Sequence, residues 1–191
     1  MILGITGGTG CGKTTLLTCL EQAGVLVLDC DAVYHHLLQT DASLLQAIAD
    51  RFPGTVEKGQ LQRKKLGSIV FSDPQALEDL NRITHGAVKA EVQRLLQEHT
   101  GHAAIDAIGL FEGGLAELCH VTVAVTAPRE DRIRRLMLRD NIPQEYAASR
   151  IDAQKPESWF RERCDYTLSN NGSLESFQAK CLAFLQEMNI M

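Results

Sequence analysis

Several features that mark other classes of protein are missing from this chain of 191 residues. No apolar run approaches the roughly 20 residues of a membrane-spanning helix, and the opening MILGITGG lacks the basic flank of a signal peptide. The six cysteines are scattered, with no C-x-x-C pair to indicate zinc or redox chemistry. The formal net charge is −5, so no positive field attracts nucleic acid or anionic lipid. These absences predict a cytoplasmic protein with reduced thiols and neither a nucleic-acid nor a membrane partner.

A glycine-rich segment near the amino terminus is the most informative stretch. Residues 7–14 read GGTGCGKT and fit the phosphate-loop pattern G-x-x-x-x-G-K-[ST], with a buried-strand pattern in residues 1–6 and a helical pattern in residues 15–20. This order aims backbone N–H groups and the positive helix end at one point, where a phosphate binds. Lys13 can reach the β- and γ-phosphates, and the Thr14 hydroxyl can ligate Mg²⁺. A plain strand-to-helix connection is the alternative, but the Lys-Thr pair and its context favour nucleotide binding.

Strand-like and helix-like segments alternate, which indicates an α/β fold with helices on both faces of a mostly parallel, five-stranded sheet. The expected strands are residues 1–6, 25–28, 103–108, 120–125 and 166–168. The expected helices are residues 15–20, 32–39 and 44–52, one from Pro74 to about His85, one around residues 88–96, one from Pro128 to Asp140, one after Pro143, a short one from Pro156 and one capped by Ser173.

The region from residue 61 to about residue 100 shows only helical patterning. Two strands can be joined by a much shorter crossover. This region is longer than a simple crossover requires, and its extra length predicts an inserted helical subdomain that binds substrate. A turn is expected at Lys58-Gly59, just before this region.

Two carboxylates, Asp29 and Asp31, follow the second expected strand. Ligands of open α/β sheets bind at the carboxyl ends of the strands, which places both residues near the phosphates. One of them can accept a proton from an incoming hydroxyl group or hold Mg²⁺. The alternative is that Asp31 caps the next helix. The two roles require different residues, and we favour Asp31 for the chemistry.

Arginines are concentrated in the helix that starts at Pro128. Arg135 and Arg139 lie one turn apart and share a face, so they can close over ATP and disperse the charge of the transferring phosphoryl group. The alternative is a solvated helix in which Asp131 and Asp140 pair with the arginines. The sequence alone does not choose between the two.

Three further residues have two interpretations each. His85, at an expected helix end, is either a substrate contact or a cap, and Glu112, after the third strand, is either a substrate contact or a turn residue. Cys11 lies near a helix N-terminus, where a thiolate is favoured. A small residue that fits the loop is the simpler interpretation of Cys11.

Several segments together resemble the dephospho-CoA kinase family over nearly the whole chain. They are GITGGTGCGKT at residues 4–14, DCDAVYH at 29–35, GQLQRKKLGSIVFSDP at 59–74, RLMLRD at 135–140, AQ at 153–154 and NNG at 170–172. A phosphate loop alone is common to many families, but this combination is specific. The departures from the family pattern are Cys11 for serine, Gly86 for proline, Ile108 and Gly109 for proline and leucine, and Ser169 for aspartate, and the family's A-x-Q segment lacks its middle residue at Ala153-Gln154.

The resemblance implies a P-loop kinase that uses ATP and Mg²⁺ to phosphorylate the ribose 3′-hydroxyl of dephospho-CoA, the last step of coenzyme A synthesis. It implies a three-layer fold in a single domain of residues 1–191, with a CoA-substrate subdomain at about 58–101 and a lid at about 129–156. Asp31 would be the base, with Lys13 and Arg139 as catalytic partners. The implied nucleotide contacts are Gly8, Thr9, Gly10, Cys11, Gly12, Lys13, Thr14, Thr15, Arg135, Arg139, Asn171 and Gly172. The implied acceptor contacts are Asp31, Arg63, His85, Leu110 and Glu112, with Thr14 on Mg²⁺.

Other functions compatible with the phosphate loop are a different small-molecule or nucleoside monophosphate kinase, a nucleotide-dependent switch and an inactive kinase. A GTPase switch usually carries an N-K-x-D motif, which is missing here. The intact Lys13, Asp31, Arg135 and Arg139 argue against an inactive kinase. We expect a monomer or a weak homo-oligomer.

Overall fold

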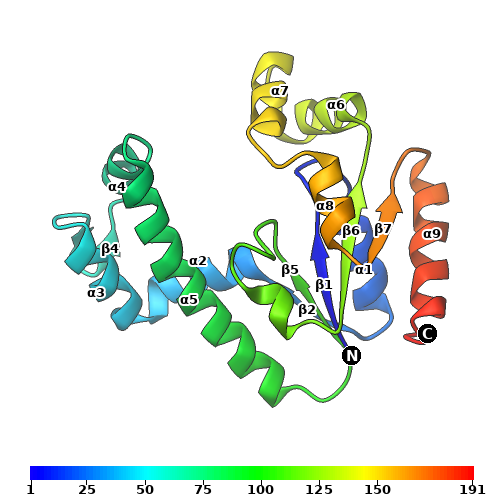
Figure 1. Ribbon diagram of the computed structural model, residues 1–191, viewed down its shortest axis with the longest axis horizontal. Helices are drawn as coiled ribbons and strands as arrows, with labels where there is room; N and C mark the ends of the chain where they lie inside the picture. The colour runs from blue at the N-terminus through cyan, green and yellow to red at the C-terminus, as the bar shows by residue number, and fades with distance from the viewer. The chain divides into compact units, whose positions relative to one another are not determined.

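The structure, a computed structural model, describes residues 1–191. The chain forms two compact units (Figure 1). Unit 1 comprises residues 1–28, 101–110 and 116–191, and unit 2 comprises residues 29–100 and 111–115. No helix combines the length and apolar character that crossing a membrane requires.

A five-stranded sheet with strand order β2-β5-β1-β6-β7 forms the centre of unit 1. The strands are β1 (Ile2–Thr6), β2 (Leu26–Asp29), β5 (Ala103–Asp106), β6 (Val121–Thr126) and β7 (Tyr166–Ser169). β1 pairs in parallel with β5 and β6, and β6 pairs in parallel with β7. The predicted five-stranded, mostly parallel sheet is confirmed. β5 is shorter than expected, because the chain turns away after Asp106.

Helices lie on both faces of this sheet, and in Figure 1 α8 is in front of the strands and α1 behind them. The helices of unit 1 are α1 (Lys13–Gln22), α6 (Arg129–Asp140), α7 (Gln144–Asp152), α8 (Glu157–Arg163) and α9 (Leu174–Glu187), and a 3₁₀ turn covers Leu115–Leu118. Alternate side chains of β1, Leu3 and Ile5, are fully buried in one cluster with α1 and α9. The three-layer arrangement predicted from the alternating pattern is confirmed.

Gly4 faces the opposite side of β1 from Leu3 and Ile5. A Cβ atom at Gly4 would lie 2.8 Å from a methyl group of Leu110 and 2.7 Å from the Cys119 sulfur. Leu110 itself is 0% exposed. The missing side chain of Gly4 therefore makes room for Leu110 in the interior.

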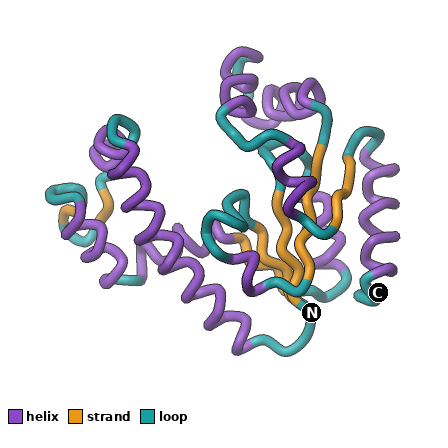
Figure 2. Tube along the Cα trace, in the orientation of Figure 1, coloured by secondary structure: helices purple, strands orange, loops and turns teal.

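Unit 2 consists of helices and one short hairpin (Figure 2). Its elements are α2 (Cys30–Thr40), α3 (Ala42–Arg51), β3 (Val56–Glu57), β4 (Gln60–Leu61), α4 (Arg63–Val70) and α5 (Pro74–Glu98). The turn predicted at Lys58-Gly59 connects β3 and β4, and both residues have positive φ angles of 51° and 73°. The two-residue strands are too short to have been recognised from the sequence.

The long helix α5 corrects one prediction. A helix end was expected near His85, but α5 continues without interruption through His85 and Gly86. Glycine in a helix costs about 1 kcal/mol relative to alanine. Burial of Val88 and Val92 further along the same helix outweighs that local preference. The predicted start is confirmed, since the Asp73 carboxylate accepts hydrogen bonds from the first turn.

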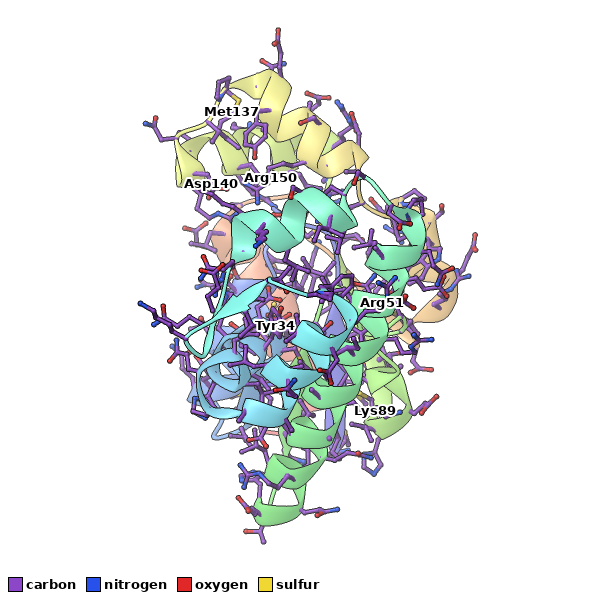
Figure 3. All side chains as sticks on the ribbon, turned by 90° about the vertical axis from the view of Figure 1, so that its left-hand side faces the viewer. Tyr34, Arg51, Lys89, Met137, Asp140 and Arg150 are labelled. Carbon is purple, nitrogen blue, oxygen red and sulfur yellow. The ribbon has the colours of Figure 1, made fainter.

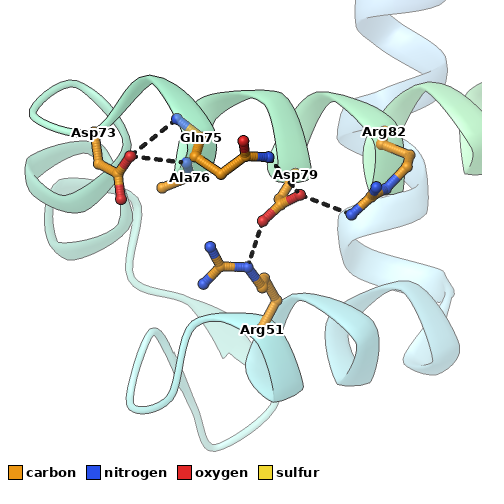
Figure 4. A network of polar contacts seen from close by, with 6 residues as sticks. All are labelled: Arg51, Asp73, Gln75, Ala76, Asp79 and Arg82. Carbon is orange, nitrogen blue, oxygen red and sulfur yellow. Dashed lines mark hydrogen bonds and ion pairs between the residues drawn. The ribbon is translucent and has the colours of Figure 1, made fainter.

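An ion-pair network joins α3 to α5 within unit 2 (Figure 4). Asp79, only 8% exposed, accepts from Arg51 Nε on α3 and from Arg82 Nη2 on α5, both at 2.7 Å. The hydrogen bond from Arg51 lowers the pKa of Asp79. The carboxylate is therefore charged at neutral pH and fixes the packing of the two helices.

Candidate active site

The phosphate loop connects β1 to α1 at the carboxyl end of β1. Gly7, Gly10 and Gly12 have φ angles of 140°, 77° and 96°, a region that other residues rarely adopt. Gly12 is the N-cap residue of α1, and no side chain caps this helix. The first N–H groups of α1 therefore remain available to an anion at the positive end of the helix.

Lys13 and Thr14 are the first two residues of α1. The ammonium group of Lys13 folds back over the loop and donates to the Gly7 carbonyl at 3.1 Å. Thr14 is exposed, and its hydroxyl group makes no hydrogen bond. A free hydroxyl at this point fits a Mg²⁺ ligand. No group of three or more His, Cys, Asp or Glu residues lies close enough together to form a metal site.

Asp106 was not singled out from the sequence. It ends β5, and its register partner on the adjacent β1 is Ile5, the residue before Thr6 and the phosphate loop. Ligands of open α/β sheets bind outside the carboxyl ends of the strands, so Asp106 lies at the ligand-binding edge of the sheet. In the sequence, the signal that could have revealed Asp106 was its place directly after the apolar run AAI at residues 103–105.

Arg135 is one of the two predicted lid arginines, and it lies against the phosphate loop. Its Nη1 atom donates to the carbonyl oxygens of Gly10 at 3.2 Å and Cys11 at 3.4 Å. Its Nη2 atom donates to the carbonyl oxygen of Asn170 at 3.4 Å. The side chain therefore joins α6 to the loop and to the segment after β7.

Arg139 points to a different partner. Its guanidinium group contacts Asp140 at 2.7 and 3.0 Å, and Arg150 on α7 contacts the same carboxylate at 2.6 Å (Figure 3). Hydrogen bonds from Arg139 and Arg150 lower the pKa of Asp140 to about 2. Of the two predicted arginines, the structure thus places one on the phosphate loop and holds the other on Asp140.

The helix pair α6–α7 has its own small core of Ile133, Leu136, Ala147 and Ile151. The end of α6 is marked by Asn141, whose φ angle of 50° is left-handed. The segment predicted as a lid is therefore a helical hairpin attached to β6 on one side and α8 on the other.

Arg132, one turn before Arg135, was not recognised from the sequence. Its Nε atom donates to the Thr9 carbonyl at 2.9 Å, and its Nη2 atom donates to Gln154 Oε1 at 2.8 Å. Gln154 Oε1 also accepts the Thr9 N–H at 2.9 Å. The spacing of three residues from Arg135 was the available signal, because it places both side chains on one helix face.

Asn170 also contacts the loop, whereas the sequence analysis named its neighbours Asn171 and Gly172. The Asn170 side chain is 6% exposed and donates to the Cys11 carbonyl at 2.9 Å. Asn171 and Gly172 are exposed, and Asn171 Oδ1 accepts from Lys180 at 3.0 Å. Their predicted contacts with the nucleotide remain predictions.

Cys11 is a buried residue of the loop, with 3% of its surface exposed. Burial raises the pKa of its thiol, and the nearby charges of Arg132 and Lys13 offset this only in part. The protonated thiol is favoured, so the structure supports the simpler interpretation of a small residue that fits the loop. Thr15 continues the loop into α1, where its N–H donates to the Gly12 carbonyl at 3.1 Å.

Asp29 and Asp31 have separate roles at the start of α2. Asp29 Oδ1 accepts from the N–H groups of Asp31 at 2.9 Å and Ala32 at 3.1 Å. Asp29 is therefore the cap, and the alternative that Asp31 caps this helix is wrong. The Asp31 side chain is exposed and makes no hydrogen bond, so its carboxylate is available to a substrate.

Arg63 lines a cavity of about 210 Å³ within unit 2. Its Nη2 atom lies 3.2 Å from His35 Nδ1, and because arginine only donates, His35 Nδ1 is the acceptor. The other lining residues are mainly apolar: Tyr34, Leu38, Leu61, Leu66, Gly67, Val70, Phe71 and Leu80. Burial raises the pKa of Tyr34, so its phenol is neutral. The cavity offers one cation beside an apolar wall.

The remaining acceptor candidates are dispersed. His85 is half-buried in the middle of α5, and Glu112 is exposed in the segment 111–115. Both belong to unit 2, whereas the buried Leu110 belongs to unit 1. Their roles at the acceptor remain predictions.

Comparisons with known proteins agree with this geometry. A family model described as dephospho-CoA kinase matches residues 1–176. The chain belongs to the dephospho-CoA kinase family. Family members named dephospho-CoA kinase from Syntrophotalea carbinolica and Thermus thermophilus are each 36% identical to it, over 98% of this chain and 92% of theirs. The resemblance and the kinase class predicted from the sequence are confirmed.

Solved structures extend the comparison to the fold. The crystal structure of TT1252 from Thermus thermophilus has a TM-score of 0.81 and 35% identity, covering 98% of this chain and 97% of that one. Dephospho-CoA kinase from Campylobacter jejuni has a TM-score of 0.71 and 25% identity, covering 98% and 96%. A shikimate kinase from Bacteroides thetaiotaomicron, 13% identical with a TM-score of 0.56 and coverage of 97% and 98%, shares the fold alone.

Proposed function

We propose that this member of the dephospho-CoA kinase family transfers the γ-phosphoryl group of ATP to the 3′-hydroxyl group of dephospho-CoA. The observation that carries the proposal is the phosphate loop itself. Its glycines have the required backbone angles, its helix end is uncapped, and Arg135 and Asn170 hold it from outside. Phosphoryl transfer depends mainly on positioning and on neutralising charge, and this arrangement supplies both.

The loop would bind the β- and γ-phosphates through its N–H groups and through Lys13. The ammonium group of Lys13 would give up its hydrogen bond to the Gly7 carbonyl and donate to a phosphate oxygen instead. Thr14 and Asp106 are the residues that would hold Mg²⁺ together with phosphate oxygens. When bound, the metal offsets the negative charge of the phosphates. Arg135 and Arg139 would add positive charge from the helical hairpin, with Arg139 leaving Asp140.

Asp31 is the proposed base for the acceptor hydroxyl. Asp29 already accepts the first free N–H groups of α2, so no hydrogen bond of the helix cap is lost when Asp31 takes a proton. Its exposure keeps its carboxylate accessible. Arg63 is proposed to meet an anionic group of dephospho-CoA beside the apolar cavity, with His85, Leu110 and Glu112 as further proposed contacts.

A panel of acceptors tests this function. Purified protein is incubated with MgATP and dephospho-CoA, AMP, CMP, UMP or shikimate, and the product is detected by mass. We expect an increase of one phosphate on dephospho-CoA only, and no product when EDTA replaces Mg²⁺. Faster turnover of a nucleoside monophosphate would show that the acceptor is wrong, and tight ATP binding with no product would favour a regulatory role.

A further inference from the structure

Arg132 is a buried cation without an anionic partner. It is 7% exposed, and its two hydrogen bonds go to neutral acceptors, the Thr9 carbonyl and the Gln154 side chain. The two neutral acceptors satisfy the N–H groups of Nε and Nη2 that reach them, but they do not compensate the charge. Buried charges in proteins are normally paired or bind a ligand, since removing a charge from water is costly.

The other arginines of α6 show that Arg132 is an exception. Arg129, Arg134 and Arg139 each contact a carboxylate at 2.7–2.8 Å. The carboxylate of Asp152 is already held by Arg129, whose hydrogen bonds lower its pKa first, with the charge of Arg132 as the last contribution. Within α6, only Arg132 and Arg135, the arginines that contact the phosphate loop, lack a carboxylate partner, and Arg132 is the more deeply buried of the two.

The guanidinium group lies directly over the loop. A Cβ atom on Gly8 would collide with Arg132 Nη2 and would lie 2.8 Å from its Cζ atom. The third nitrogen, Nη1, makes no hydrogen bond. Gln154 fixes the orientation, because its Oε1 atom accepts from both Arg132 and Thr9 N–H.

We propose that Arg132 is a nucleotide-binding residue whose counter-charge is the polyphosphate chain of the bound nucleotide, with Gln154 as its positioning residue. The proposal rests on the proposed function in one respect only, that a nucleoside triphosphate occupies the loop. The charge at Arg132 would then favour binding of phosphates beyond what the N–H groups and Lys13 provide.

Binding measurements without any acceptor test this assignment. Affinity for MgATP is measured by titration calorimetry and affinity for adenosine by ligand-observed NMR, with thermal unfolding of the free protein alongside. R132M should weaken MgATP binding about 10-fold or more, the usual range for a charged hydrogen bond. It should leave adenosine binding within about twofold and should not lower the unfolding temperature of the free protein, because it removes an uncompensated buried charge.

Two further variants complete the test. R134M changes the same residue type on an exposed face of α6 and should leave MgATP affinity within about twofold. R132Q keeps polar groups near Thr9 but removes the positive charge. If R132M does not fold, the MgATP affinity of R132Q tests the proposal in its place. MgATP affinity within about twofold of wild type in R132Q overturns the proposal. Equal losses for MgATP and adenosine, with a lower unfolding temperature, also overturn it by indicating a role in loop structure. Because no acceptor is present, failure of dephospho-CoA turnover would leave this result unaffected.

Discussion

Asn170 donates its side-chain amide to the carbonyl oxygen of Cys11 at 2.9 Å, although 159 positions separate the two residues in the chain. The Asn170 backbone N–H donates to the Thr126 carbonyl at 2.7 Å, which fixes the residue at the end of β6. Arg135 donates to the carbonyl groups of both Cys11 and Asn170. The segment after β7 is therefore part of the support of the phosphate loop.

Asn170→Ala should lower the free energy of unfolding by about 1–2 kcal/mol, because a buried hydrogen bond is lost and the Cys11 carbonyl loses a partner. The loop should also become less ordered, so MgATP should stabilise the variant less than it stabilises wild type. Urea denaturation with and without MgATP measures both effects.

Asn171→Ala is the matched stability control for Asn170→Ala. Its side chain is exposed, and its contact with Lys180 lies at the surface. We expect a change in unfolding free energy within about 0.5 kcal/mol. Equal destabilisation by the two variants would contradict the role assigned to Asn170.

The same substitution should have opposite effects at two glycines. Gly12→Ala places a side chain at a φ of 96° and against Asn170 Nδ2, so it should destabilise the protein by about 2 kcal/mol or more and abolish nucleotide binding. Gly86→Ala meets no atom within 4 Å and lies within α5, so it should stabilise the protein by about 0.5–1 kcal/mol. Thermal unfolding of both variants decides this, and a less stable Gly86→Ala would show that α5 is strained at this point.

The elements that could be predicted are those specified by local chemistry. Asp73 before Pro74 and Ser173 before α9 accept the hydrogen bonds of a cap, as their positions indicated. The predicted break at His85 was wrong for a physical reason. Gly86 lowers helix propensity locally, but α5 is held by the burial of Val88 and by packing against α2 and α3.

The site was predictable where a fixed spacing carries the chemistry. Lys13 and Thr14 follow the glycines at set positions and begin α1, while their roles at the nucleotide stay predictions. Arg132 and Asn170 were missed, because their contacts with Thr9 and Cys11 span 123 and 159 positions. Such contacts follow from the order of strands in the sheet, which no local pattern reveals.

The pairing of Asp140 with Arg139 and Arg150 predicts a pH-dependent contribution to stability. The pKa of Asp140 in the folded protein is about 2, below its ordinary value, so the contribution is complete above about pH 4 and is lost as the pH falls towards 2. The difference in unfolding free energy between wild type and Asp140→Asn should be constant at neutral pH and should shrink in that acid range. Urea titrations between pH 2 and 7 measure it, and a difference that grows on acidification contradicts the assigned direction.

Asp29 and Asp31 provide an internal comparison at the start of α2. Asparagine caps helices as well as aspartate does, so Asp29→Asn should keep the cap, the stability and most of the turnover. Asp31 accepts no hydrogen bond in the fold, so Asp31→Asn should also leave stability unchanged. Each variant removes one negative charge, at positions two residues apart. A difference in turnover between them therefore reports the role proposed for Asp31.

Asp31→Asn should bind MgATP as wild type does and transfer phosphate to dephospho-CoA about 100-fold more slowly or worse, the usual loss when a general base is removed. Lys13→Ala should differ from it by weakening MgATP binding itself, since the ammonium group is lost from the phosphate loop. Calorimetric titration with MgATP and steady-state turnover of dephospho-CoA separate binding from chemistry in each variant. Wild-type turnover in Asp31→Asn would show that Asp31 is not the base. An equal loss of turnover in Asp29→Asn would show the same, because Asp29 is the helix cap and is not proposed to take the proton.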